Sequence, residues 1–199
     1  ESSLQETTDV LQRIRELSVQ AGNGVYSDED RHMIQTEVSQ LVQEIDRIAS
    51  TAQFNGMNLL TGRFAETGIT FHVGANVDQN ISVKIGSMDA KSLGLKDSQG
   101  TENSISVDSP EKANMTIATI DEALKKVSQQ RAELGATSNR MDMAKKGVDT
   151  YAENLQASES RIRDADMAKE MVEFTKNQVL QSASVAMLAQ ANSNSQNVL

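Results

Sequence analysis

Four groups of residues carry side chains that could act in catalysis or hold a metal ion. Carboxylates cluster at residues 28–30 and flank Ala165 at 164–166, and the two imidazoles are His32 and His72. Neither histidine has a serine, cysteine or metal-ligand partner at a useful spacing, and residues 164–166 lack the glycine and glutamate of a calcium loop. Acidic residues directly after Ser27 suit the positive end of a helix dipole. The sequence therefore predicts no catalytic site, no metal site and no cofactor.

The composition and net charge of the chain exclude some classes of binding partner. The 199 residues include 19 Lys and Arg against 28 Asp and Glu, a net charge of -9, and aromatic residues make up 3%. Such a negative chain repels nucleic acid and anionic membrane surfaces, so we expect neither as a partner. With no cysteine and few aromatic residues, burial must depend on aliphatic side chains, which favours helix packing.

The strongest pattern lies after Pro110, the only proline. Ser109 can cap a helix there, and proline is well tolerated at the first helical position. Apolar residues then recur at every seventh position: Ala113, Ile120, Val127, Leu134, Met141, Val148, Leu155 and Ile162. Ile117 and Leu124 begin a companion stripe that later turns polar. This heptad predicts one helix roughly 80 Å long with a continuous core seam.

Two shorter helices are predicted upstream. The first contains Leu4, Leu11, Ile14 and Leu17 and ends at Gly22-Asn23-Gly24, where left-handed geometry is tolerated. The second begins after the N-cap Ser27 and extends to Ala52, with apolar residues spaced alternately by four and three. Neither is long enough to cover the long helix, which predicts that a second copy or further sequence covers the remainder.

The segment between these helices follows a different pattern. Asn55-Gly56 is a turn signal, and residues 69–73 and 81–85 alternate between apolar and polar, which predicts a β-hairpin. Residues 86–109 are interpreted as a compact loop with one short strand at 105–107. From residue 177 to 199 there is no charged residue, which indicates close packing against protein.

These elements predict a mainly α fold: an elongated antiparallel helical bundle or coiled coil with a small β-hairpin. Four regions are expected. Residues 1–60 form the N-terminal part of the helical core, 61–109 the hairpin and loop, 110–163 the long helix of the core, and 164–199 a C-terminal helix, which a family resemblance implies to be an inner-domain helix of a coiled coil.

Several motifs resemble those of the bacterial flagellins. In the N-terminal half they are residues 11–20 (LQRIRELSVQ), 44–49 (EIDRIA), 53–56 (QFNG) and 73–76 (VGAN). In the C-terminal half they are residues 134–136 (LGA), 139–140 (NR), 160–168 (SRIRDADMA) and 188–192 (LAQAN). The resemblance spans nearly the whole sequence and keeps the family's order. Compared with the family pattern, the sequence is core-only: it lacks the N-terminal inner-domain helix and the large outer domains.

The resemblance implies a non-enzymatic filament subunit that self-assembles for motility after type III export. It implies other flagellin subunits, an export chaperone, the filament cap and the hook-filament junction proteins as partners. The implied location is the extracellular flagellum. Residues 23–31 also resemble flagellins of periplasmic flagella, so that location is the alternative.

The family's recognition patch for Toll-like receptor 5 corresponds to Arg13, Leu17 and Glu37. Arginine and leucine four residues apart share a helix face and combine a charged donor with an apolar anchor. The competing interpretation is that this face packs against neighbouring subunits. Two other functions remain as alternatives, a hook-filament junction protein and a generic coiled-coil adaptor.

Overall fold

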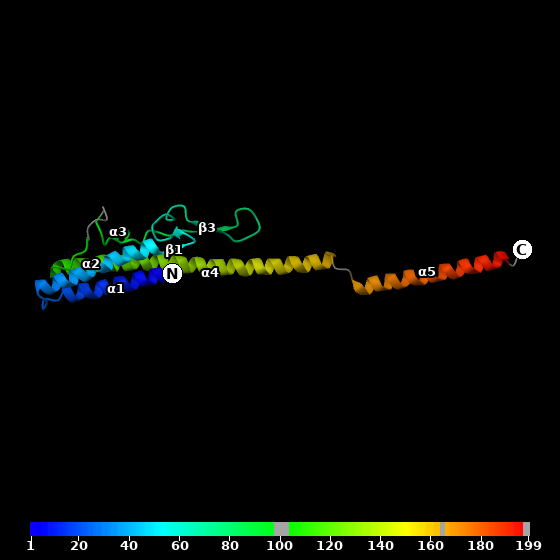
Figure 1. Ribbon diagram of the computed structural model, residues 1–199, viewed down its shortest axis with the longest axis horizontal. Coiled ribbons are helices and arrows are strands. Elements are labelled where there is room, and N and C mark those ends of the chain that lie inside the picture. The colour runs from blue at the N-terminus through cyan, green and yellow to red at the C-terminus, as the bar shows by residue number, and fades with distance from the viewer. Residues whose placement is uncertain (98–103, 164–165, 197–199) are drawn as a thin grey trace. The chain divides into compact units, whose positions relative to one another are not determined.

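The computed structural model describes residues 1–97, 104–163 and 166–196. Its helices are α1 Ser2–Ala21, α2 Asp28–Thr51, α3 Ala90–Leu93, α4 Pro110–Arg163 and α5 Met167–Gln196, and its strands are β1 Gln53–Phe54, β2 Met57–Asn58, β3 Ile69–His72 and β4 Asn80–Val83 (Figure 1). The expected mainly α class is confirmed. Contacts divide the chain into two units, residues 1–148 and 149–199, and α4 contributes to both. The four expected regions remain predictions.

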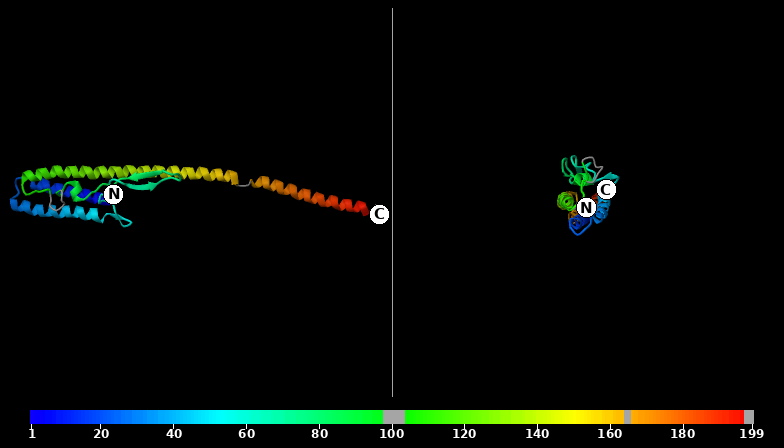
Figure 2. Two further views of the ribbon diagram at one scale, coloured as in Figure 1. Left: turned by 90° about the horizontal axis from the view of Figure 1, so that it is seen from above. Right: turned by 90° about the vertical axis from the view of Figure 1, so that its left-hand side faces the viewer.

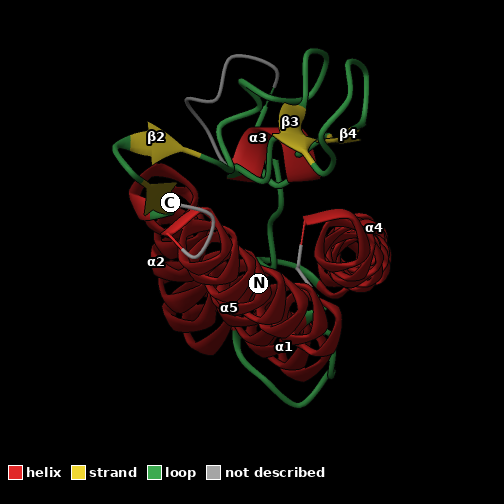
Figure 3. Ribbon diagram, turned by 90° about the vertical axis from the view of Figure 1, so that its right-hand side faces the viewer, coloured by secondary structure: helices red, strands yellow, loops and turns green. Residues whose placement is uncertain are grey.

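The core of the first unit lies between α1, α2 and the first part of α4, which form three neighbouring helices (Figures 2 and 3). One helix face from each supplies the apolar side chains, because residues three and four apart share a face. The fully buried members include Leu11, Ile14, Val38, Ile45 and Ile120. The β-strands and α3 lie on one side of this bundle (Figure 3).

The link between α1 and α2 is set by local signals. Ser27 caps α2 as predicted: its Oγ accepts a hydrogen bond from the N–H of Asp30 at 3.2 Å, and the Asp30 carboxylate accepts one from the Ser27 N–H at 3.0 Å. The residues at the end of α1 tolerate left-handed geometry but do not adopt it: Gly22 has φ -69°, and neither Asn23 nor Gly24 has a positive φ. The first helix therefore ends without a left-handed residue.

The predicted hairpin is present as β3 and β4, which pair antiparallel with Ile69 opposite Val83 and His72 opposite Asn80. A second, shorter hairpin joins β1 to β2 through Asn55 and Gly56, whose φ angles of 49° and 74° are both positive. Paired positive φ angles match a type I′ turn, which Asn-Gly favours. The sequence identified this turn but not the strands that it connects.

The predicted strand at 105–107 is wrong. Ile105 and Val107 are buried, but their backbone is irregular. The Val107 N–H donates to the Oε1 of Gln35 on α2 at 2.7 Å, so it is bonded to a side chain and not to a neighbouring strand. The one-turn helix α3 was also not predicted. Asp46 of α2 holds its first residue by accepting from the Ala90 N–H at 2.8 Å.

The start of α4 agrees with the prediction. The helix begins at Pro110, and the Oγ of Ser109 accepts from the N–H of Lys112 at 3.3 Å. The predicted polar break after α4 falls on residues 164–166, of which 164 and 165 lie outside the described residues. None of the helices described here is both long and apolar enough to cross a bilayer.

Candidate functional site

The clustered carboxylates at 28–30 serve the start of α2. Asp30 belongs to the capping box, and its hydrogen bond to the Ser27 side chain lowers the pKa of its carboxyl group. Asp28 pairs with Arg31 at 3.1 Å. His32 lies on α2 and His72 on β3, and within the described ranges no three His, Cys, Asp or Glu residues form a group that could hold a metal ion.

Arg31 is a charged side chain whose burial was not predicted from the sequence. It is 5% exposed, and its guanidinium donates to the carbonyl oxygens of Ala21 at 3.0 Å and Asn23 at 3.3 Å. Carbonyls at a helix C-terminus have no partner within the helix. Arg31 therefore joins the end of α1 to the beginning of α2.

The predicted seam of α4 changes its environment along the helix. Ile120 and Val127 are fully buried, and Leu134 and Met141 pack partly buried against the core. The exposed fractions then rise to 44% at Val148, 70% at Leu155 and 88% at Ile162. The heptad is thus an internal seam at its beginning and an uncovered apolar stripe at its end.

The second buried stripe of α4 is displaced by one residue from the expected one. Thr116, Ala123 and Gln130 are buried, whereas Ile117 and Leu124 are only partly so. These three also recur every seven residues, but two of them are polar and resemble surface positions in the sequence. Because Thr116 and Gln130 are polar, the apolar spacing in the sequence did not predict this stripe.

The polar members of this stripe attach loops to α4. The Nε2 of Gln130 donates to the Lys84 carbonyl at 3.1 Å, and its Oε1 accepts from the Gly86 N–H at 3.0 Å. The Oγ1 of Thr116 donates to the Ser106 carbonyl at 2.9 Å. Because each buried polar atom is paired, the loops are held in place without a desolvation cost from unmade bonds.

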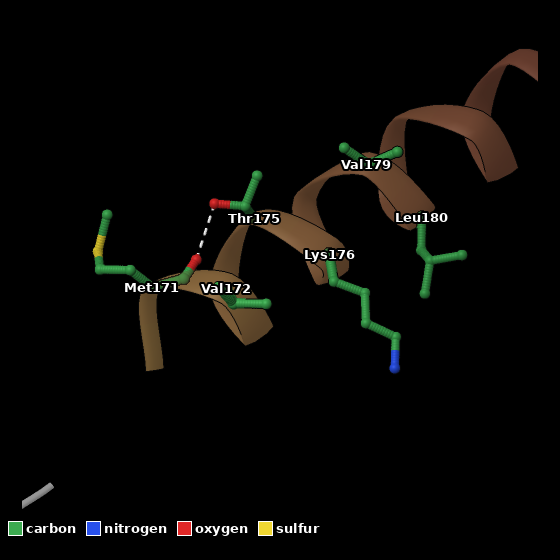
Figure 4. Close-up of a pocket in the computed structure, with 6 residues that line it drawn as sticks. All are labelled: Met171, Val172, Thr175, Lys176, Val179 and Leu180. Carbon is green, nitrogen blue, oxygen red and sulfur yellow. Dashed lines mark hydrogen bonds between the residues drawn. The ribbon is translucent and has the colours of Figure 1, made fainter. Parts of the chain in front are cut away.

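Helix α5 presents apolar side chains to solvent. Figure 4 shows part of this surface, formed by Met171, Val172, Thr175, Lys176, Val179 and Leu180. Val172 is 67% and Leu180 54% exposed, and the Thr175 hydroxyl donates to the Met171 carbonyl at 2.7 Å, so it needs no outside partner. An apolar surface of this kind marks a site of protein contact.

The structure brings together two of the three residues expected in the receptor patch, Arg13 and Glu37, and buries the third, Leu17. Arg13 donates to Glu37 at 2.8 Å across α1 and α2, and this hydrogen bond and charge raise the pKa of Arg13. Both side chains are about half exposed, at 51% and 46%. The expectation that Leu17 forms an accessible anchor beside them is wrong, because it is 2% exposed and belongs to the core.

The polar groups of the helical core are hydrogen-bonded within the first unit, whereas α5 and the end of α4 expose apolar faces. This arrangement is typical of a subunit that buries its apolar faces in an assembly. The model of the bacterial flagellin N-terminal helical region matches residues 1–65, and that of the bacterial flagellin C-terminal helical region matches residues 117–199. The chain belongs to the bacterial flagellins. It is a structural subunit of the flagellar filament.

Flagellar proteins of other bacteria match this chain over its full length. It is 62% identical to a flagellar filament 30.7 kDa core protein of Treponema maltophilum and 60% identical to flagellin FlaB2 of Treponema pallidum, covering 100% of this chain and 72% of each relative. Identity to the flagellin of Bacillus subtilis is 44%, over 100% of this chain and 74% of that protein. These matches exclude a generic coiled-coil adaptor.

Solved structures share the fold. A crystal structure of Bacillus cereus flagellin has a TM-score of 0.61 at 28% identity, covering 79% of this chain and 86% of the other. A putative flagellar hook-associated protein from Vibrio parahaemolyticus has a TM-score of 0.59 over 80% and 82% of the two chains. At 14% identity the second likeness shows the fold alone.

Proposed function

We propose that this chain builds the filament by burying the open faces of α5 and of the end of α4 between copies. The exposed large apolar residues of α5 carry this proposal: Met167, Met171, Val172, Phe174, Val179, Leu180, Val185, Met187 and Leu188. Burying one such side chain contributes about 1.5–3 kcal/mol. A contact of this kind that does not close on itself extends into a fibre.

Leu180→Asp tests this burial. The substitution places a charge on the apolar face of α5, and a buried unpaired charge is strongly unfavourable. We expect filament length, measured by electron microscopy of cells carrying the variant as their flagellin, to fall at least tenfold. The first unit should keep its thermal unfolding midpoint, because Leu180 lies outside it.

Leu180→Met is the matched control, since it keeps the size and apolarity of the side chain. Cells carrying it should produce filaments of normal length. Normal filaments with Leu180→Asp would show that this face is not buried in the assembly.

The chain has a structural and not a catalytic role. The assignment of the carboxylates at 28–30 to the start of α2 supports this. The high identity to Treponema filament core proteins supports the periplasmic flagellum over an extracellular one. An export chaperone, the filament cap and the hook-filament junction proteins are further partners of the proposed subunit, as its membership of the flagellin family suggests.

A second function, recognition by Toll-like receptor 5, is supported by the exposed pair of Arg13 and Glu37. Arg13→Ala removes a guanidinium that could bind a receptor carboxylate, and we expect it to reduce receptor activation by purified monomers about tenfold. Arg15→Ala is the matched control: this arginine is also exposed and pairs with Asp121 at 2.8 Å. Equal potency of the two variants would remove Arg13 from the patch.

A further inference from the structure

The link between α1 and α2 carries an unusually exposed apolar side chain. Val25 is 86% exposed, and the residues on either side of it, Gly24 and Tyr26, make no apolar cover for it. The backbone beneath is fixed, because Arg31 donates to the carbonyls of Ala21 and Asn23. Val25 therefore protrudes from a link whose shape does not depend on it.

A second feature of the first unit is an apolar groove with a volume of about 320 Å³. Both hairpins and α4 contribute to its lining, which includes Phe54, Phe71, Val83, Leu134, Ser138 and Met141. Phe54 is 70% and Phe71 42% exposed, so its walls are open to solvent. The groove is large enough to admit a valine side chain.

The surroundings of these two features carry opposite charge. The first turn of α2, directly after the link, carries three acidic residues, Asp28, Glu29 and Asp30. The charged residues that neighbour the groove lining are mostly basic, namely Lys84, Arg140, Lys145 and Lys146, with Glu133 and Asp142 as acidic ones. Opposite charge on two surfaces favours their encounter in one register.

The two features cannot meet within one chain. The link lies at the end of the first unit where α1 joins α2, whereas the hairpins lie farther along α4 (Figures 1 and 2). A contact between them must therefore join two copies. Such a contact uses different surfaces on each copy, so in a filament it can repeat from one copy to the next.

We propose that Val25 of one copy occupies the groove of the next copy, with the acidic residues directly after the link facing Arg140 and Lys145. This contact rests on the proposed function, since it assumes a filament of identical subunits. It names a link-to-groove contact within the first unit, separate from the burial of α5. Val77 is equally exposed, at 88%, but it belongs to the loop of the hairpin that forms the groove.

Cysteine cross-linking tests this contact directly, because the chain contains no cysteine. Val25→Cys and Ser138→Cys place one thiol on the link and one at the exposed edge of the groove. Filaments from cells carrying both substitutions are treated with a short bismaleimide and separated under denaturing conditions. We expect a ladder of dimers, trimers and longer oligomers, since every copy has both halves of the contact.

Single substitutions and a displaced cysteine provide the controls. Each single variant should remain monomeric, and filaments mixed from the two single variants should give dimers and no longer species. Val19→Cys with Ser138→Cys should also remain monomeric, because Val19 is 52% exposed on α1 but lies outside the link.

The outcomes separate this contact from filament formation itself. Normal filaments of the double variant without a ladder would overturn the link-to-groove contact and leave the proposed function intact. A ladder from Ser138→Cys alone would also overturn it, since grooves would then face one another. Failure of the unsubstituted subunit to form filaments in the same cells would instead count against the proposed function.

Discussion

Ile120→Ala is expected to lower the free energy of unfolding by about 3 kcal/mol. Ile120 is fully buried between the helices of the first unit, so alanine removes apolar contacts and leaves a cavity that helices can only partly close. Urea unfolding followed by circular dichroism measures the change. The unfolding of the purified subunit, rather than of filaments, isolates this effect from assembly.

Ile162→Ala is the matched control, because it removes the same atoms from the same heptad position. Ile162 is 88% exposed, so the unfolding free energy of the subunit should change by about 0.5 kcal/mol or less. Filament length should nevertheless fall. A large loss of stability with Ile162→Ala would show that the end of the stripe is already covered within the monomer.

Arg31→Ala is expected to have the second largest effect, a loss of about 2–3 kcal/mol in unfolding free energy. Alanine removes the Arg31 donor from the Ala21 carbonyl, leaves the Asn23 carbonyl with the Tyr26 N–H at 3.4 Å, and opens space between two helices. Arg31→Lys should recover only part of the loss, because an ammonium cannot reproduce the planar, forked donor geometry of a guanidinium.

Arg47→Ala is the control for the loss of an arginine from α2. Its side chain is 60% exposed and pairs with Glu44 one turn away, so its removal should leave the unfolding midpoint unchanged. Equal effects of the substitutions at positions 31 and 47 would show that Arg31 acts through general charge and not through its buried contacts.

Local signals made the helices predictable from sequence. Ser27 and Pro110 mark helix starts through their own backbone chemistry, and apolar spacing marks the buried faces. Elements too short to show a period were missed, namely α3 and the two-residue strands β1 and β2. Their positions depend on distant partners, such as the Asp46 carboxylate that accepts from Ala90.

The sequence did not predict the burial of site residues that are covered by other helices or loops. Leu17 belongs to the apolar stripe that contains Ile14 and Ala21, so packing against α2 and α4 covers it although Arg13 remains accessible. The buried positions of Thr116 and Gln130 depend on loops whose carbonyls lie far away in the sequence. No spacing within α4 identifies those acceptors.

The way Arg31 binds the link has a consequence for how this protein can change over evolutionary time. Its guanidinium recognises main-chain oxygens, which every amino acid supplies, and not the side chains at positions 21 and 23. Substitutions in the turn can therefore accumulate without separating the helices that it joins. Side chains of this turn other than Val25 can therefore change while the bundle beneath keeps its geometry.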